Sequence, residues 1–174
     1  MPLIIKGTDG DFTPAPPGIH QAVCVDVVDL GMVDGTFGLK RKLKLVWQLK
    51  ARNEKNERFQ VRATYTQSLH EKSRLRHDLE TWRGRPFTKD ELKAFDVEAL
   101  IGANCQIQVG HRVSAQGRTY ANAMSIVPIM KGTEKLKAEQ YEREPWPTDP
   151  DTIDGHSEDE GGSIPVDDGS ETPF

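Results

Sequence analysis

A chain of 174 residues with a formal net charge of −4 is long enough for one domain with a single hydrophobic core. It contains no apolar run of 18 residues and no secretory signal pattern around residues 3–5, so we expect no membrane partner and a cytoplasmic location. Its two cysteines, Cys24 and Cys105, are too few for a secreted disulfide scaffold. We expect both to be buried thiols, since each lies in an apolar, strand-like run.

Charge is divided unevenly along the chain. Residues 18–131 hold nineteen Lys and Arg against twelve Asp and Glu, whereas residues 132–174 hold three against thirteen. The body is therefore basic and the tail acidic, although the whole chain is mildly acidic. This division is typical of a protein that binds a polyanion while its tail competes weakly for the same surface.

The first elements are an arm, a strand and a turn. Residues 1–17 end in Thr-Pro-Ala-Pro-Pro, which cannot join a sheet ladder and predicts an extended arm. Residues 19–30 alternate with a period of two, which predicts a strand. Its two faces carry Val23, Val25 and Val27 against Ala22, Cys24 and Asp26. Residues 31–38 contain three glycines and predict a turn.

Two further strands follow, at residues 39–51 and 59–66, joined by a hairpin turn at residues 53–56. The apolar face of the first carries Leu43, Leu45, Trp47 and Leu49, and its other face carries Lys40, Lys42, Lys44, Val46, Gln48 and Lys50. The apolar face of the second carries Phe59, Val61, Ala63 and Tyr65. Short connections between the three strands predict an antiparallel meander.

The period then changes to that of a helix. Residues 68–71 match a capping box, apolar residues follow at helical spacing through residues 75–82, and Gly84 is the expected C-cap. A second capping box at residues 88–91 predicts a short helix through Phe95. Basic residues away from the apolar stripe are interpreted as a soluble outer face rather than an extension of a basic track. They are Lys72, Arg74, Arg76, Arg83 and Arg85.

Alternation returns at residues 105–110 and 118–129, which predicts two last strands joined by a loop at residues 114–117. Residues 131–145 are expected to form a frayed helix, and the chain beyond residue 145 is expected to be disordered. We therefore divide the chain into an arm (1–17), a domain (18–130) and an acidic, largely disordered tail (131–174).

The order strand-strand-strand-helix-strand-strand predicts a mainly β fold. We expect a five-stranded OB-like Greek-key barrel with the helix between strands three and four. Other five-stranded half-barrels with one helix share this order, and the sequence does not exclude them. OB barrels bind oligonucleotides on the face of strands two and three and between the loops that join strands 1–2 and 4–5.

Basic side chains lie on the face of strands two and three opposite the apolar stripe. Lys40, Lys42, Lys44 and Arg62 are the candidates for phosphate contacts. Their spacing of about 6–7 Å along a strand matches an extended phosphate backbone. An ordinary solvated face is the alternative interpretation.

Single-strand binders also need aromatic rings on which bases stack. Phe37, in the glycine-rich turn, and Tyr120, near Arg112 and Arg118, are the candidates. Tyr65 is a third, provided that it lies near the barrel rim. Trp47 and Phe59 are in phase with the apolar stripe and are expected in the core.

The last nine residues, Val-Asp-Asp-Gly-Ser-Glu-Thr-Pro-Phe, form an acidic segment ending in an aromatic ring. An apolar slot rimmed by Lys or Arg in a partner would take the ring and the carboxylates. The candidate partner-binding residues are Asp167, Asp168, Glu171, Pro173 and Phe174. An acidic solubility tail is the alternative interpretation.

This segment resembles the C-terminal tip of bacterial and phage single-stranded-DNA-binding proteins. Together with the stretches at residues 64–69 and 82–85 and the order of elements, it makes the chain similar to small phage- or prophage-encoded OB-fold proteins of that type. The resemblance implies sequence-independent coating of single-stranded DNA in replication, recombination or repair, with the tip recruiting replication and recombination proteins. It leaves open whether the chain prefers DNA to RNA and whether it forms a homo-oligomer.

No cofactor, metal site or enzymatic activity is expected. His70 and His77 are seven residues apart, and neither cysteine has a ligand partner at metal-binding spacing. Asp26, Asp29 and Asp34 form the only loose carboxylate group in the body and are interpreted as turn and edge residues. Two other classes of function stay open. One is an adaptor that binds replication or recombination enzymes without touching DNA, and the other is an acidic decoy that mimics DNA.

Overall fold

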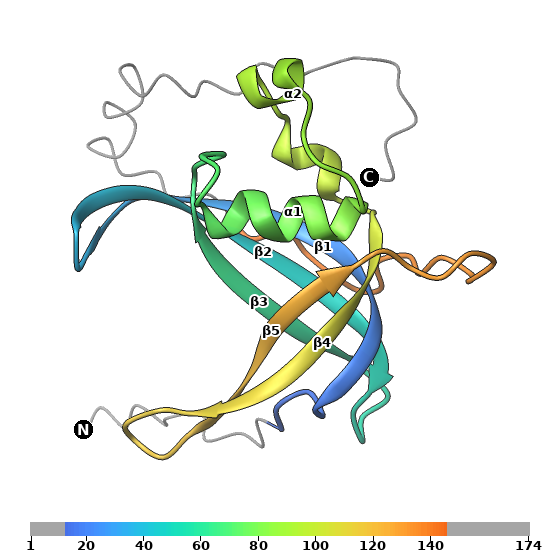
Figure 1. Ribbon diagram of the computed structural model, residues 1–174. Helices are drawn as coiled ribbons and strands as arrows, with labels where there is room; N and C mark the ends of the chain where they lie inside the picture. The colour runs from blue at the N-terminus through green and yellow to red at the C-terminus, as the bar shows by residue number, and fades with distance from the viewer. Residues whose placement is uncertain (1–12, 146–174) are drawn as a thin grey trace.

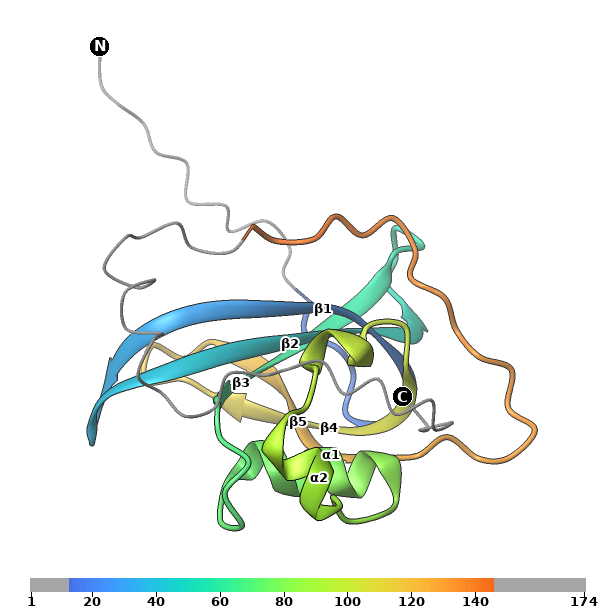
Figure 2. The same cartoon turned by 90° about the horizontal axis from the view of Figure 1, so that it is seen from above.

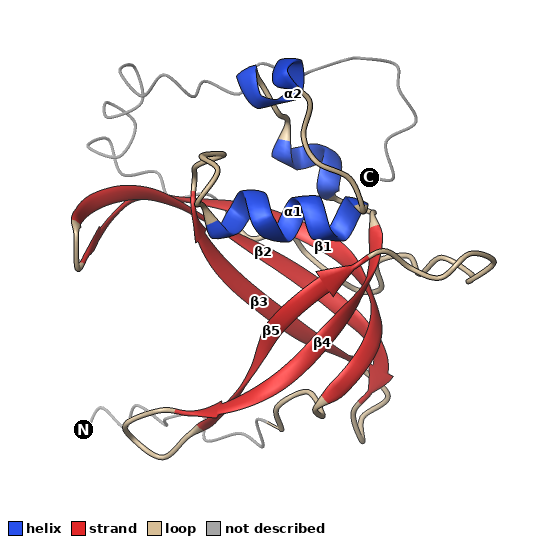
Figure 3. Ribbon diagram, viewed as in Figure 1, coloured by secondary structure: helices blue, strands red, loops and turns tan. Residues whose placement is uncertain are grey.

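The computed structural model describes residues 13–145, and the fold is mainly β (Figures 1 and 3). Five antiparallel strands form one sheet: β1 (Gly18–Gly35), β2 (Gly38–Arg52), β3 (Arg58–Thr66), β4 (Asn104–Val113) and β5 (Thr119–Val127). Between β3 and β4 lie the helices α1 (Arg74–Arg83) and α2 (Lys89–Lys93) and the 3-10 helix η1 (Val97–Leu100). The expected order of elements is confirmed.

The strands are ordered β3-β2-β1-β4-β5 across the sheet. The sheet curls until its two edge strands, β3 and β5, contact each other, and α1 packs against both (Figure 1). No hydrogen-bonded ladder joins β3 to β5 in the described chain, so the sheet is open. The curl encloses one apolar interior, because the inner faces of all the strands turn toward one another.

The turn expected over residues 31–38 is wrong in extent. β1 and β2 stay paired as far as Gly35 and Gly38, so that only Thr36 and Phe37 form the turn. Gly38 has a φ of 94°, a backbone conformation that residues with a side chain rarely adopt. Because β1 pairs with β4 only from Gly18 to Val23 and β3 pairs with β2 only from Lys42 onward, the distal part of the β1–β2 hairpin, residues 31–41, forms a projecting ribbon. The tips of this ribbon and of the β4–β5 hairpin lie on the same side of the molecule in Figures 1 and 2.

A β-bulge in β1 corrects the expected division of its faces. The register of β1 against β2 shifts between Cys24 and Asp26, so Val25 has no cross-strand partner. Cys24 and Val27 consequently share the main core, whereas Val23 and Val25 pack on the opposite side of the sheet. The predicted all-valine face therefore holds only as far as the bulge.

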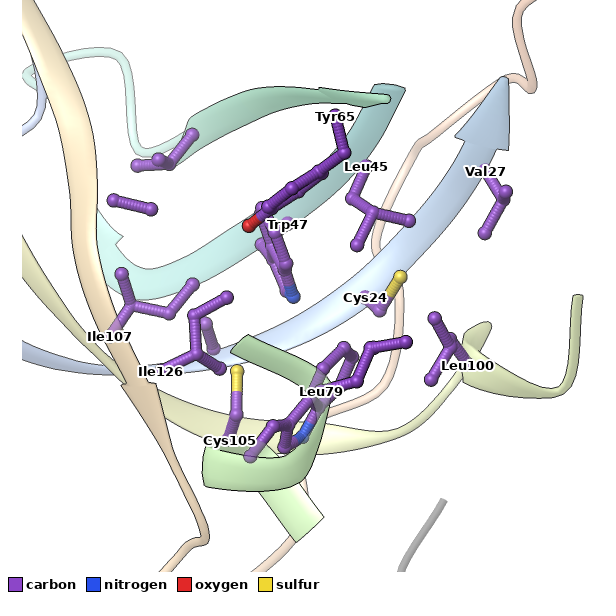
Figure 4. Close-up of a cluster of buried hydrophobic side chains, with 14 of the residues drawn as sticks. Cys24, Val27, Leu45, Trp47, Tyr65, Leu79, Leu100, Cys105, Ile107 and Ile126 are labelled. Atoms are coloured by element: carbon purple, nitrogen blue, oxygen red, sulfur yellow. The ribbon is translucent and has the colours of Figure 1, made fainter. Parts of the chain in front are cut away.

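The main core lies between the sheet and α1, as the close-up in Figure 4 shows. Leu45 and Trp47 of β2 point inward, and the ring centroids of Trp47 and Trp82 of α1 are 6.0 Å apart. The apolar stripe predicted for β2 is confirmed as core, and Phe59 packs against it, half-buried. Cys24 and Cys105 are buried free thiols, as expected.

The start of α1 differs from the prediction. Its N-cap is Ser73, whose hydroxyl accepts a hydrogen bond from the Arg76 N–H at 3.1 Å. Ser68 instead shapes the preceding loop, because its Oγ accepts from the N–H of His70 at 3.2 Å. Gly84 ends α1 in the left-handed region with a φ of 73°, as predicted.

The second capping box is confirmed at Thr88 and Glu91, but α2 ends at Lys93, before the expected limit at Phe95. Glu91 also accepts two hydrogen bonds from the Arg83 guanidinium, at 2.7 and 3.1 Å. The side chain of Arg83 is fully buried. Interpreting Arg83 as part of a soluble outer face is therefore wrong, because this arginine holds α2 against α1.

Both ends of the described chain are docked on the sheet. Ala15 is buried in the core, and the ring Nε2 of His111 lies 2.6 Å from its carbonyl oxygen. Residues 131–145 form no helix, which makes the expected frayed helix wrong. Residues 134–144, which we call the strap, instead run extended over β1 and β2 on the side opposite α1 (orange in Figure 2). Their apolar residues, Leu136 and Tyr141, pack against the outer valines of the sheet.

Candidate nucleic-acid interface

The outer face of β2 and β3 carries the predicted basic side chains. The strand register places Lys42 opposite Thr66, Lys44 opposite Thr64 and Val46 opposite Arg62. Residues that alternate on one strand and are paired across two strands share a face. The structure thus brings Lys40, Lys42, Lys44 and Arg62 together on the face that points away from the core, as the sequence predicts.

Part of this face is occupied by the strap. Glu144 forms an ion pair with Lys44, and its other carboxylate oxygen lies 3.4 Å from Arg62. Two of the four predicted phosphate-binding cations are therefore neutralised by a carboxylate of the same chain. A carboxylate that bridges two cations offers them charged oxygen acceptors of the kind that a phosphate group also presents.

The strap is anchored on a buried carboxylate. Asp26 is fully buried, and its carboxylate accepts hydrogen bonds from the Tyr141 hydroxyl at 2.8 Å, Arg143 Nε at 3.0 Å and the Glu144 N–H at 2.8 Å. Burial acts to raise the pKa of Asp26, but these three donors outweigh it and hold the pKa below its usual value. Asp26 was interpreted as an edge residue, and that interpretation is wrong because it holds the strap in place.

Two side-chain amides extend the sheet to the strap. The Asn104 amide donates to the Leu136 carbonyl at 3.0 Å and accepts from its N–H at 2.7 Å. The Gln48 amide makes the same pair of bonds with Glu139, at 2.6 and 2.8 Å. Each amide thus reproduces the two hydrogen bonds of a neighbouring strand. Arg52 completes the attachment by binding the Glu139 carboxylate through two nitrogens, at 2.7 and 2.9 Å.

The remaining part of the face is open. Within residues 13–145, no ion pair engages Lys40 or Lys42. The Lys40 ammonium lies 5.9 Å from the centre of the Phe37 ring, and that ring is 88% exposed at the tip of the ribbon. A cation and an open aromatic ring are thus presented side by side, next to Lys42.

The other predicted group lies on the β4–β5 hairpin. Arg112 and Tyr120 are direct cross-strand partners, and Arg118 lies in the turn, where its N–H donates to the Ser114 hydroxyl at 3.2 Å. The Tyr120 side chain is exposed. This second aromatic and basic group is therefore carried by a different hairpin from Phe37.

Tyr65 does not belong to the exposed aromatic group. Only 3% of its surface is accessible, and its hydroxyl donates to Asp78 at 2.8 Å. Burial, reinforced by the neighbouring Asp78 carboxylate, raises the pKa of Tyr65. The candidate role of Tyr65 in base stacking is corrected, because the ring faces the core between β3 and α1.

The sequence analysis did not single out the hydroxyl residues on and beside β3. Thr64, Thr66, Ser68 and Lys72 line one pocket with Lys40. A signal for this region was present, since residues 58–70 contain no Asp or Glu. The anchors Gln48 and Asn104 carried no comparable signal, because a polar residue in a strand is ordinarily solvated.

In the described part of the chain, no group of three His, Cys, Asp or Glu side chains is arranged to hold a metal ion. No helix there is long and apolar enough to cross a membrane. The predicted tip residues Asp167, Asp168, Glu171, Pro173 and Phe174 lie outside the described residues.

No protein-family model matches the chain, and no curated protein is significantly similar to it in sequence.

Proposed function

We propose that this protein binds single-stranded DNA without sequence preference, on an OB-type barrel. The strand order, the contact between the edge strands and the position of α1 between β3 and β4 support the barrel assignment. In an OB barrel the ligand crosses strands two and three between two flanking loops. The projecting β1–β2 and β4–β5 hairpins correspond to those loops.

The observation that carries the proposal is the unneutralised cationic face beside an exposed ring. Lys40 and Lys42 supply charge for two consecutive phosphates, and Phe37 supplies a platform for a base. Phosphates and ring faces are common to every sequence, so binding through them is independent of sequence. Arg112 and Tyr120 extend the same chemistry on the other hairpin.

The strap gives this surface a built-in competitor. A phosphate that binds Lys44 and Arg62 must displace Glu144, because one pair of cations cannot hold both anions at once. Binding on this half of the face is therefore weaker than on the half around Lys42. Replacing Glu144 by glutamine is expected to tighten oligonucleotide binding a few-fold, because the competing charge is removed.

The wider role follows from the resemblance to single-stranded-DNA-binding proteins. We place the protein in DNA replication or recombination in the cytoplasm, with the acidic segment that contains Phe174 recruiting partner enzymes. Recruitment is tested separately from DNA binding, by pull-down with a Phe174→Ala variant.

The decisive measurement is fluorescence anisotropy of labelled oligo(dT) against a duplex of equal length, at low and moderate salt. We expect tight, salt-sensitive binding that strongly favours the single strand. The Lys42→Glu variant should weaken binding to every sequence alike and reduce the salt slope by about one. Lys89→Glu, an identical charge change on α2, serves as the matched control.

Two results would contradict the proposal. Absence of binding to oligo(dT) at low salt would eliminate DNA coating and favour an adaptor role. Equal affinities of Lys42→Glu and Lys89→Glu would show that the strand does not follow the face of β2 and β3.

A further inference from the structure

Two pockets lie beside β2 and β3, and they differ in charge. The first, of about 650 Å³, contains Arg52 and Arg58, but Glu57 and Glu139 line it as well. Since Arg52 binds the Glu139 carboxylate through two nitrogens, the charge of this pocket is already balanced by the strap. It has little attraction left for an anion.

The second pocket, of about 460 Å³, lies between β3 and the loop that precedes α1. Its lining consists of three cations, four hydroxyl residues, one histidine and Tyr65: Lys40, Thr64, Tyr65, Thr66, Ser68, His70, Lys72, Ser73 and Arg74. None of the carboxylates in residues 13–145 lines it, although Glu71 lies in the same loop. Its volume falls within the roughly 300–1,000 Å³ of small-molecule sites.

The wall of this pocket is organised without a ligand. The Ser73 hydroxyl donates to the Ser68 carbonyl at 2.6 Å, and the Ser73 N–H donates to the His70 carbonyl at 2.8 Å. The Lys72 N–H lies 3.2 Å from His70 Nδ1. These bonds fix the loop backbone and leave the Lys72 ammonium outside every ion pair in residues 13–145. A preformed wall reduces the entropy lost on binding.

Arg74 adds a planar guanidinium to the lining of the pocket. Its guanidinium lies 5.4 Å from the centre of the Tyr65 ring and is also 3.5 Å from the Asp78 carboxylate. The Arg74 side chain is nevertheless 61% exposed. Arginine planes of this kind stack on nucleic-acid bases.

The pocket lies directly beside the lysines of β2, which are Lys40, Lys42 and Lys44. Thr64 and Thr66, which line it, are the cross-strand partners of Lys44 and Lys42. Paired residues have Cβ atoms about 4.5–5.5 Å apart, so a strand that leaves Lys42 reaches the pocket within one nucleotide. We propose that this pocket binds one nucleotide of the DNA strand, with Lys40 and Lys72 on its phosphate, the threonine hydroxyls as additional donors, and Arg74 against its base.

This inference deepens the proposed function and rests on it for the source of the nucleotide. It also revises the interpretation of Lys72 and Arg74, which the sequence alone assigned to a soluble helix face. Lys72 precedes the N-cap of α1, where a carboxylate is compatible with the helix. The Lys72→Glu substitution therefore changes the charge of the pocket without disturbing the fold.

Two titrations of the full-length chain test the pocket. The first measures oligo(dT) affinity by anisotropy for wild type, Lys72→Glu, Lys42→Glu and the control Lys89→Glu. We expect Lys72→Glu to weaken binding about fivefold or more and to lower the salt slope by about one, with Lys89→Glu unchanged. The second follows backbone amides by NMR while deoxythymidine 5′-monophosphate is added. We expect shifts at Thr66, Ser68 and Lys72 that thymidine without phosphate does not produce.

The outcomes separate this inference from the proposed function. If wild type binds oligo(dT) and only Lys42→Glu weakens it, the pocket assignment is overturned and the face stands. If wild type binds no oligonucleotide, the proposed function fails, and the mononucleotide titration decides the pocket alone. Shifts confined to the pocket and lost in Lys72→Glu then support a nucleotide site, and no shifts overturn it.

Discussion

The two sides of β2 are both covered, but by different kinds of structure. On the core side, Leu45 and Trp47 pack against α1 in a continuous apolar interior. On the strap side, Val46 and Gln48 are just as buried, yet the segment above them has no regular secondary structure and is attached by side-chain hydrogen bonds and ion pairs. Residues of β2 are therefore buried in two ways, by apolar packing against α1 and by coverage under the strap. Only the packing against α1 can be predicted from the periodicity of the strands.

Each side also contains a carboxylate held by an arginine, and the two pairs differ in exposure. Arg83 and Glu91 are almost completely enclosed, with 0% and 9% of their side chains accessible. Arg143 is 46% exposed, although its partner Asp26 is fully buried. Water can replace Arg143 but not Arg83, so the two pairs should respond differently to loss of the arginine.

The largest expected effect comes from replacing these arginines one at a time. Arg83→Met leaves the buried Glu91 carboxylate with only the partly exposed Arg85 and the Thr88 N–H as partners, and we expect it to lower the free energy of unfolding by about 3 kcal/mol. Arg143→Met should lower it by about 1 kcal/mol, because Tyr141 and the Glu144 N–H still solvate Asp26. Urea denaturation of both variants measures the difference, and equal losses would show that the strap is as integral as the core.

A smaller effect is expected from valines on the two sides. Val61 faces the main core and Val46 faces the strap, and no more than 1% of the surface of either residue is accessible. Val61→Ala should destabilise the fold by about 2 kcal/mol through lost burial and a cavity. Val46→Ala should lower the stability by only about 1 kcal/mol, since the strap can settle into the space. Thermal and chemical denaturation compare them, and a larger loss for Val46→Ala would reverse the ranking of the two sides.

The smallest effect is the release of the strap from the sheet at low pH. Asp26 has a folded-state pKa below its usual value, so its contribution to strap docking is complete at neutral pH and is lost as pH falls through that pKa. The pKa of Glu139 is lowered as well, by its hydrogen bond from Arg52, and it acts in the same direction. We expect the NMR amide signals of Tyr141 and Glu144 to move toward unfolded positions below about pH 4, before those of β2.

Asp26→Asn is the control for this acid response. It removes the charge that titrates while keeping the size of the side chain, so its strap amides should already be shifted at neutral pH and should change little on acidification. Strap amides of Asp26→Asn that are unshifted at neutral pH and follow those of the wild type on acidification would show that the Asp26 charge does not hold the strap.

The core side could be predicted from the sequence because local periodicity determines it. The stripe of β2, the Gly84 cap and the capping box at Thr88 all follow from neighbouring residues. The bulge at Val25 could not be predicted, because alternation continues through it and only the pairing with β2 reveals the shift. The same holds for Arg83, whose burial depends on Glu91 in the next helix.

The candidate site was predictable to the same extent. The shared face of Lys40, Lys42, Lys44 and Arg62 follows from strand alternation, and the exposure of Phe37 follows from its turn. The ion pair between Lys44 and Glu144 could not be predicted, since the two residues are a hundred positions apart in the sequence. The absence of Asp and Glu from residues 58–70 can be seen in the sequence. That several of these residues line one pocket could be found only from the folded structure.

The strap also completes the outer surface of the sheet. A shorter chain that stopped at Met130 would uncover Val23, Val25 and Val46 on the outside of the sheet and strip Asp26 of its three donors. A bare apolar patch around an uncompensated carboxylate favours aggregation. A shortened version of this domain that keeps these contacts therefore has to extend at least to Glu144, and a protein divided at the change in charge near residue 131 would lose them.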